Sequence, residues 1–331
     1  MPRLKAVVEA ADRIPMRARI GLVIVAAVVA IVVVVVRDDG SGDRRFARAE
    51  GGVAGVAERS SYLGAGDGGR GWIRSRPGRM SVVWAAGDGA NGSPQASAVA
   101  TMIASQRVDR FLYLGDVYQA GTAREYEVNY RPSFGRLDQV AAPTVGNHEW
   151  PNASTGYIPY WTGVRGSPPP LWYAFAASGW QLISLNTNPP AATSPAQLGW
   201  LQATIRKTQR YGNCRTAFFH HPIYSAGLHG DVPGLEPVRS ALEGKASIVL
   251  SGHDHDLQRL RPINGITQLI SGAAGARVYP VNRDDPRLAF FDDTHHGAVR
   301  LRLTPGRAVV SFVASDGTLL DRSVVRCSQA G

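Results

Sequence analysis

Cysteine is nearly absent from this chain of 331 residues. The only two cysteines are Cys214 and Cys327, and neither lies in a Cys-x-x-Cys or another zinc-binding spacing. This scarcity argues against a thiolate metal site. In an oxidising compartment the pair can form a disulfide that ties the C-terminal tail to the strand entering the AFFHHP segment (217–222). The alternative is two unpaired thiols.

Lysine is also scarce, since only Lys5, Lys207 and Lys245 occur among 36 basic residues. The glycine-rich segment GAGDGGRG (64–71) lacks the Gly-Lys-Ser/Thr of a phosphate-binding P-loop, which excludes that class of nucleotide site. The formal net charge is +10, but more than half of it lies in residues 1–80. Nucleic acid is therefore not an expected partner. The mildly positive remainder suits an anionic substrate.

A single long apolar run, IGLVIVAAVVAIVVVVV, occupies residues 20–36. As a helix it spans roughly 26 Å, close to the lower limit for crossing a bilayer. Five basic residues between positions 3 and 19 precede it, and they predict a cytoplasmic N-terminus and an exported body. The alternative is secretion after cleavage of a signal peptide, whose apolar core is shorter and is followed closely by a small-residue site. The only such site, at 47–49, lies well beyond the run, so we expect an uncleaved, single-pass membrane anchor.

Composition divides the rest of the chain. We expect a cytoplasmic N-terminus (1–19), a transmembrane anchor (20–36), a flexible linker rich in Gly, Arg, Ser and Ala (37–80) and one folded domain (81–331). From residue 81 onward short apolar runs alternate with helical segments, which predicts an α/β fold. Residues 297–325 alternate apolar and polar residues around a Pro-Gly and an Asp-Gly turn, which predicts an antiparallel meander.

Five of the predicted strands end in polar side chains that can bind metal or move protons. These residues are Asp88, Asp116, Asn147, His148, His220, His253 and His255. The carboxyl ends of strands in α/β folds converge on one crevice, so the seven can meet despite their separation in sequence. A single strand-end aspartate is usually a cap and a single histidine usually a packing residue. A set of carboxylate, amide and imidazole groups without thiolate suits Fe, Mn or Zn.

The motifs GD (87–88), GD (115–116), GNHE (146–149), HHP (220–222) and GHDH (252–255), in this order, resemble those of the calcineurin-like metallophosphoesterase superfamily. The HHP block and GHDHDLQR (252–259) resemble its purple acid phosphatase-like branch. The resemblance covers roughly residues 81–325. It implies a four-layer α/β/β/α sandwich of the metallophosphoesterase type, here preceded by the one expected transmembrane helix, with a dinuclear metal centre.

The resemblance also implies roles for the strand-end residues. Asp116 would bridge two metal ions of Fe, Mn or Zn. Asp88 and His255 would bind the first ion, and the second would be held by Asn147, His220 and His253. His148 is not a ligand in this pattern and looks like the catalytic residue that either protonates the leaving alkoxide or stabilises the charge developing there. Such a pair of ions activates a water and clamps phosphate oxygens.

This chain departs from the family pattern around the first metal. The Asp-x-His ligand of many members is missing, since residue 90 is alanine. Purple acid phosphatases place a tyrosine three residues after the bridging aspartate, where this chain has Gln119, whereas Tyr118 comes one residue early. We expect Tyr118 to reach the metal; the alternative is that water or backbone completes the site. A tyrosinate ligand would favour ferric iron.

Several neighbouring residues keep two interpretations each. Glu149 and Asp254 either orient ligands or are solvated loop acids, and His221 either lines the pocket or packs. Arg259 either contacts phosphate or lies on the surface. His295 and His296 lie either at the pocket rim or in an ordinary loop. The aromatic residues of 150–161 either stack on a substrate or pack over the sandwich.

The function that these features predict is hydrolysis of a phosphorylated small molecule by an exported, membrane-anchored phosphomonoesterase. The first alternative is a phosphodiesterase or pyrophosphohydrolase with the same centre, because loops rather than strand ends set the substrate. A non-catalytic phosphoester-binding relative is a further alternative, supported only by the incomplete first metal site.

Overall fold

The computed structural model describes residues 71–329. The expected transmembrane anchor (20–36), the N-terminus before it and most of the expected linker therefore lie outside the described residues. Within residues 71–329, no helix has the length and apolar character needed to span a membrane.

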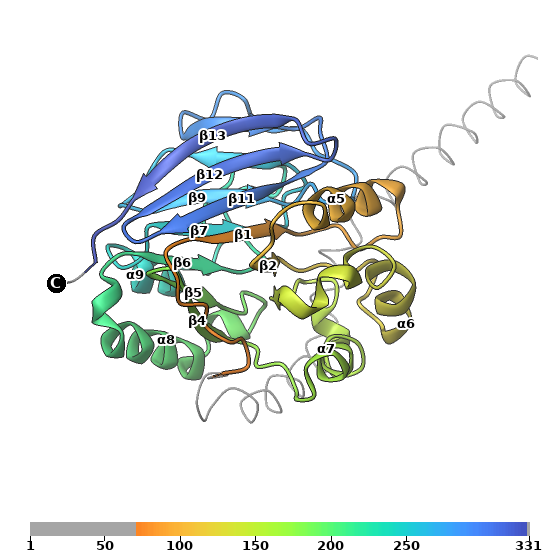
Figure 1. Ribbon diagram of the computed structural model, residues 1–331, viewed down its shortest axis with the longest axis horizontal. Coiled ribbons are helices and arrows are strands. Elements are labelled where there is room, and N and C mark those ends of the chain that lie inside the picture. The colour runs from red at the N-terminus through yellow and green to blue at the C-terminus, as the bar shows by residue number, and fades with distance from the viewer. Residues whose placement is uncertain (1–70, 330–331) are drawn as a thin grey trace, which may run out of the picture. The chain divides into compact units, whose positions relative to one another are not determined.

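Two β-sheets form the centre of the fold (Figure 1). One sheet has six strands, in the order β13 (Leu319–Arg326), β12 (Arg307–Ala314), β11 (Gly297–Thr304), β1 (Ser81–Ala86), β2 (Arg110–Tyr113) and β3 (Ala141–Pro143). The other has seven, in the order β10 (Leu288–Asp292), β8 (Leu257–Leu260), β9 (Thr267–Ser271), β7 (Ile248–Ser251), β6 (Arg215–Phe218), β5 (Trp180–Ser184) and β4 (Tyr173–Ala177). The strands β1, β2 and β3 run parallel in the first sheet, as do β5, β6, β7 and β9 in the second.

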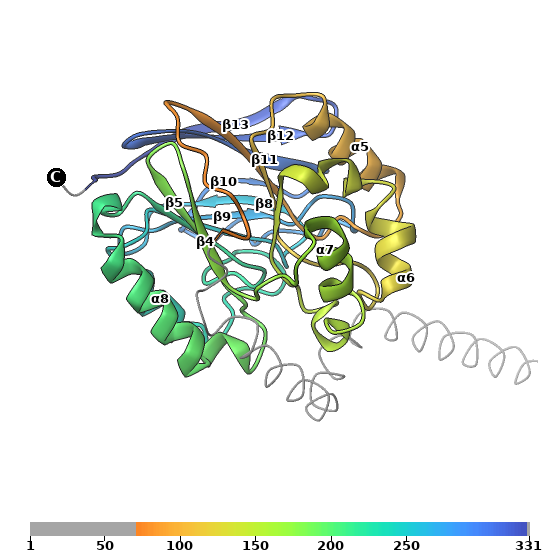
Figure 2. The same cartoon turned by 60° about the horizontal axis from the view of Figure 1, so that its bottom comes forward.

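Helices flank these sheets (Figure 1 and Figure 2). They are α5 (Pro94–Ala104), α6 (Ala123–Glu125), α7 (Tyr157–Arg165), α8 (Pro195–Lys207) and α9 (Glu236–Leu242). A π-helical turn (Tyr126–Tyr130) and short 3₁₀ segments, the longest at Phe134–Val140, complete the connections. In Figure 2, α8 lies on the side of β4 and β5, whereas α5, α6 and α7 gather on the opposite side.

The start of α5 follows from local chemistry. Ser93 is its N-cap, and its hydroxyl accepts a hydrogen bond from the Ala96 N–H at 3.2 Å. Pro94 occupies the first turn, where a missing N–H is harmless.

The two faces of β1 show how the layers form, because alternate side chains of a strand point to opposite faces. Val83 and Ala85 belong to the core between the sheets, together with Leu250 and Leu269 of the second sheet. Trp84 points the other way and packs with residues of α5 in the outer core. The outer faces of β5, β6 and β7 are covered in the same manner by Leu201 of α8 and by Val238 and Leu242 of α9. The predicted α/β fold with two sheets is confirmed.

The C-terminal meander also agrees with the prediction. β11, β12 and β13 pair antiparallel in sequence order. The turns between them contain Gly306 and Gly317, with φ values of 74° and 91°. This left-handed conformation favours glycine, which explains the Pro-Gly and Asp-Gly pairs.

The folded part begins before residue 81. Trp72 packs edge-on against Tyr173 of β4, with 5.2 Å between ring centroids, and Ile73 is buried. The Arg76 N–H donates to the Ala176 carbonyl at 2.8 Å. Residues 71–80, which composition groups with the linker, therefore rest on the edge of the seven-stranded sheet.

Cys214 and Cys327 form a disulfide across 113 residues of sequence, with their Cα atoms 5.0 Å apart. Cys214 is buried just before β6, and Cys327 follows β13. The bond therefore joins the seven-stranded sheet to the edge of the six-stranded sheet. The interpretation of two unpaired thiols is wrong.

Replacing both cysteines with alanine should lower the free energy of unfolding by about 2–4 kcal/mol, because the crosslink restricts a long loop in the unfolded chain. Urea denaturation of the oxidised wild type and the double variant measures this difference. Metal content should not change, because Cys214 lies directly before the start of β6 and the candidate site lies at the other end of that strand. Equal unfolding midpoints would contradict the stabilising role.

Candidate metal centre

The strand-end residues singled out in the sequence meet at one place, where the carboxyl ends of β1, β2, β3, β6 and β7 come together. The Asn147 amide oxygen lies 2.7 Å from His220 Nε2 and 3.1 Å from His253 Nδ1. Asp116 Oδ2 is 3.4 Å from His220 Nε2. Asp88 Oδ1 is 3.5 Å from His255 Nε2. Residues from both sheets therefore contribute to a single cluster.

Three of these residues have an unusual backbone. Asp88, Asp116 and His253 have φ values of 60°, 68° and 70°. A non-glycine residue in this left-handed region costs roughly 1–3 kcal/mol and persists where the surroundings hold it. The Asp88 carboxylate helps to stabilise these conformations, since its Oδ2 accepts the His253 N–H at 2.9 Å and so connects the two sheets. The strained turns aim the side chains into the cluster.

The glycines of the motifs are required by close approach. A Cβ at Gly146 would lie 2.1 Å from Asp116 Oδ1, and one at Gly252 would lie 2.3 Å from Asp88 Oδ2. Both distances are far below van der Waals contact. A side chain at either position would displace a carboxylate, which is the physical reason for Gly-Asn and Gly-His in this sequence.

Backbone carbonyls orient three of the histidines. His220 Nδ1 is 2.8 Å from the Leu114 carbonyl, His255 Nδ1 is 3.0 Å from that of Arg277, and His148 Nδ1 is 2.6 Å from that of Gln119. A carbonyl oxygen only accepts, so Nδ1 carries the proton in each ring. Nε2 of His220 and His255 is therefore available to the cluster, the arrangement typical of metal-binding histidines.

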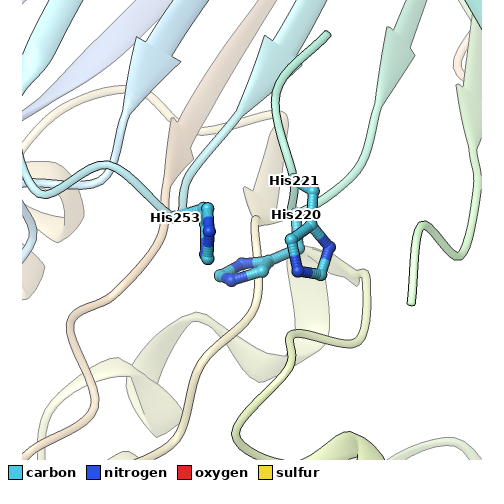
Figure 3. A group of neighbouring side chains, drawn as sticks. All are labelled: His220, His221 and His253. Atoms are coloured by element: carbon cyan, nitrogen blue, oxygen red, sulfur yellow. The ribbon is translucent and has the colours of Figure 1, made fainter. Parts of the chain in front are cut away.

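Two groups of side chains bring their donor atoms within 4.8 Å of one another. One consists of Asp88, Asp116 and His220, and the other of His220, His221 and His253. Figure 3 shows the three imidazoles of the second group side by side at the strand ends. Buried carboxylates with neutral imidazoles are a suitable donor set for divalent or trivalent transition metals. The residues present thus fit the metal ions that the sequence predicts.

The pKa shifts of His253, His221 and Asp116 favour cation binding. For His255, by contrast, the effect of burial is outweighed by the contacts with Asp88, which raise the pKa. Burial lowers the pKa of His253 well below its usual value, and the neighbouring histidines lower it further. For His221, burial together with His220 lowers the pKa to about 3. Burial opposes ionisation of Asp116, but His220 and His148 outweigh it and hold the pKa of that carboxyl below normal. Neutral imidazoles and an ionised carboxylate are the forms that bind metal.

Tyr118 reaches the cluster in spite of its early position. Its hydroxyl lies 2.8 Å from His255 Nε2 and 3.3 Å from Asp88 Oδ1, and its ring is buried. Burial, followed by the charges of Asp88 and Asp116, raises the pKa of this phenol. Gln119, which occupies the usual tyrosine position, contributes its carbonyl to His148 instead.

His221 lies against the cluster. Its ring centroid is 4.6 Å from that of His253, and its Nδ1 is 3.1 Å from the Thr187 hydroxyl. His221 is buried and therefore packs against the cluster.

Two acids have a structural role where the sequence also allowed solvated loop positions. Glu149 is fully buried and accepts the N–H groups of Asp116 and Val117, each at 3.1 Å. Asp254 is also fully buried and accepts the His229 N–H at 2.7 Å. The solvated interpretation is wrong for both.

Two aromatic rings at the cluster were not anticipated from the sequence. The His229 ring lies 4.4 Å from that of His253, and Tyr279 stacks on His255 at 4.4 Å. Both belong to loops without a recognisable motif. The position of His229, shortly after the HHP block, was the only available signal.

Other candidates make their hydrogen bonds outside the cluster. Arg259 makes a two-pronged ion pair with Asp321 of β13, at 2.8 and 3.0 Å, so the phosphate contact is not supported. His295 is exposed and pairs with Asp292. Half-buried His296 lies 3.2 Å from the Ala273 carbonyl. The aromatic residues of the first loop are buried, which supports packing rather than stacking on a substrate: Trp150, Tyr157, Tyr160 and Trp161.

The two packed sheets and the carboxylate, amide and imidazole groups at their strand ends define a metallophosphoesterase fold. The sequence model of calcineurin-like phosphoesterases matches residues 83–257. The chain belongs to this family.

Curated relatives support the purple acid phosphatase-like branch. The chain is 31% identical over 180 residues to purple acid phosphatase 21 of Arabidopsis thaliana, a match covering 47% of this chain and 39% of the relative. It is 25% identical over 158 residues to purple acid phosphatase 1 of Ipomoea batatas, covering 46% and 31%. The chain thus spans less than half the length of these relatives.

Solved structures show the same fold at low identity. A purple acid phosphatase from yellow lupin seeds matches with a TM-score of 0.63 at 14% identity, covering 76% of this chain and 54% of that one. A dimetal phosphatase from Danio rerio matches with a TM-score of 0.55 at 15% identity, covering 75% and 99%. GAP50, the anchor in the inner membrane complex of Plasmodium, gives 0.64 at 14% identity, covering 76% and 90%.

Proposed function

We propose that the protein is a metal-dependent phosphomonoesterase with a dinuclear centre, acting on a phosphorylated small molecule. The observation that carries this proposal is the meeting of Asp116, His220 and their partner ligands with His148 at the strand ends. Family membership and the purple acid phosphatase relatives support the reaction class.

Each metal position has its own set of side chains. Asp88, Tyr118 and His255 would hold the first ion, since their donor atoms lie within 3.5 Å of one another in the contacts above. Asn147, His220 and His253 would hold the second ion, and Asp116 lies within reach of both sets. Ions of Fe, Mn or Zn would supply Lewis-acid activation of water and would neutralise charge on the phosphate oxygens.

His148 is placed to act on the leaving group. Its Nδ1–H is held by the Gln119 carbonyl, and its Nε2 lies 3.7 Å from Asp116 Oδ2. The side chain is 26% exposed, so it borders solvent at the mouth of the cluster. As water attacks phosphorus and the ester P–O bond breaks, the His148 imidazole would donate its Nε2 proton to the ester oxygen, so that the products are an alcohol and inorganic phosphate.

The proposed function predicts the substrate class. With Fe, Mn or Zn bound, the full chain should hydrolyse p-nitrophenyl phosphate with a turnover of about 1–10³ s⁻¹, the usual enzyme range. Bis(p-nitrophenyl) phosphate should be hydrolysed more slowly, and removal of metal by a chelator should abolish both. Faster diester cleavage would favour the phosphodiesterase alternative. No hydrolysis with any of these metals would favour a non-catalytic binding protein.

Elemental analysis with a visible absorption spectrum on the same sample identifies the metals and tests Tyr118. A tyrosinate–Fe(III) centre absorbs in the visible, and Tyr118→Phe should remove that band while iron remains bound. A colourless protein containing two Fe(III) ions would contradict Tyr118 as a ligand.

A further prediction concerns His148. His148→Ala should retain both metals and reduce kcat by roughly 10²–10⁴, the range for a positioned acid. His295→Ala is the matched control, because that histidine is exposed and paired with Asp292; its kcat should match the wild type. Loss of metal from His148→Ala would show that His148 is a ligand instead.

We also propose that the protein acts outside the cytoplasm on a single-pass anchor formed by residues 20–36. Support comes from the apolar run with its basic N-terminal flank and from the Cys214–Cys327 disulfide, which persists in oxidising compartments. Cell fractionation should find the full-length chain in the membrane fraction. A soluble form lacking residues 1–36 would support secretion after cleavage and contradict the anchor.

A further inference from the structure

A short segment between the HHP motif and α9 carries one of the rings at the cluster. We call residues 225–231 the His229 loop. Its sequence is SAGLHGD. His229 packs its ring 4.4 Å from that of His253 and meets Tyr279 edge-on at 5.9 Å. The loop therefore adds an imidazole to the cluster that no strand end supplies.

Asp254 binds this loop through hydrogen bonds to its carboxylate. One carboxylate oxygen accepts the His229 N–H at 2.7 Å, and the other accepts the Ser225 hydroxyl. The carboxylate is fully buried. A Cβ at Gly227 would lie 2.4 Å from Asp254 Cγ, so the loop backbone rests directly on this side chain. Asp254 itself lies between the two histidines of the GHDH motif.

Gln258 strengthens the same attachment. Its side-chain oxygen accepts the Ala226 N–H at 2.9 Å, and its amide nitrogen donates to the Ser225 hydroxyl oxygen at 3.1 Å. Gln258 is fully buried and Ser225 nearly so. The inner side of the loop is therefore joined to the chain of the GHDH motif by a connected set of buried hydrogen bonds.

The outer side of the loop has a weaker attachment. Asp231 pairs with Arg287 at 2.7 Å, and both side chains are substantially exposed. An exposed ion pair contributes little to stability because water and salt screen it. Loss of a buried charged acceptor leaves its donors unpaired and has a larger effect. Asp254, rather than Asp231, is the contact on which the loop position depends.

We propose that Asp254 is a positioning residue of the metal centre, which couples the GHDH motif to the His229 loop and so fixes the His229 imidazole over His253. The activity part of this inference rests on the proposed phosphomonoesterase function. The structural part, that Asp254 orders the loop, does not.

Hydrogen exchange tests the structural part without any assay of activity. In the full chain loaded with Mn, Asp254→Ala should speed amide exchange in residues 225–231 by about tenfold or more, because each lost buried bond lowers the local opening energy. Asp231→Asn is the matched control. It keeps an oxygen for the Ser225 N–H, which donates to Asp231 at 2.9 Å, and should leave exchange unchanged. Equal exchange in wild type and Asp254→Ala would overturn the proposal.

A double-mutant cycle tests whether Asp254 acts through His229. Asp254→Ala and His229→Ala should each reduce kcat/KM for p-nitrophenyl phosphate by about tenfold to 10²-fold, the effect of a misplaced group. The kcat/KM of the combined variant should fall no further than that of the more impaired single variant, because both changes remove the same ring from its place. Metal content should remain at the wild-type level in all three. Losses that multiply, or loss of metal, would overturn the positioning role.

Ser225→Ala provides a milder variant if Asp254→Ala does not fold, since it removes one of the two donors to Asp254. It should speed exchange in the loop and reduce kcat/KM by a smaller factor, again without loss of metal. An inactive wild type with faster loop exchange in Asp254→Ala would refute the proposed function and leave the structural part standing. If the wild type is active but amide exchange in residues 225–231 is unchanged in Asp254→Ala, the inference about Asp254 is refuted and the proposed function stands.

Discussion

The candidate site depends on the close approach of backbone segments that end neighbouring strands. A Cβ at Gly115 would lie 2.7 Å from the backbone of Gly146 and 2.8 Å from His220 Nδ1, so β2, β3 and β6 approach as nearly as peptide groups allow. The carboxylates connect these segments by hydrogen bonds. Asp88 accepts the His253 N–H, and Asp116 accepts the His148 N–H. The same side chains that offer oxygens to a metal therefore also align the turns that present the other donors.

This arrangement concentrates negative charge where water is excluded. Asp88, Asp116 and Glu149 are all buried within one small region. Burial, with the nearby charge of Asp116, raises the pKa of Glu149 well above its usual value. Isolated buried carboxylates are strongly unfavourable, and partial compensation comes from backbone N–H groups and imidazoles. A cation between Asp88 and Asp116 would complete that compensation, which is why such a cluster is more readily understood as a metal site than as a structural feature.

Much of the site could be predicted from the sequence because its donors sit at strand ends. Parallel strands bring their carboxyl ends to one edge, so Asp88, Asp116 and His220 were expected to meet before any distance was known. The partners of loop residues could not be predicted in this way. The pairing of Arg259 with Asp321 joins positions 62 residues apart, and His229 reaches His253 only because a buried aspartate binds its loop. Periodicity contains no information about such contacts, which depend on tertiary packing.

The structure thus separates two determinants of activity. The sheets determine which donors meet, because moving Asn147 or His220 would require a shift of β3 or β6 in the core. Loops determine what surrounds the donors, because the rings of His229 and Tyr279 are held by local hydrogen bonds and stacking. Substitutions within the loops are therefore expected to alter the substrate while the predicted metal ligands stay in place. Asp254 links the two determinants, since it follows His253 in the chain and accepts the His229 N–H of the loop. Through it, the loop that carries His229 is fixed relative to His253.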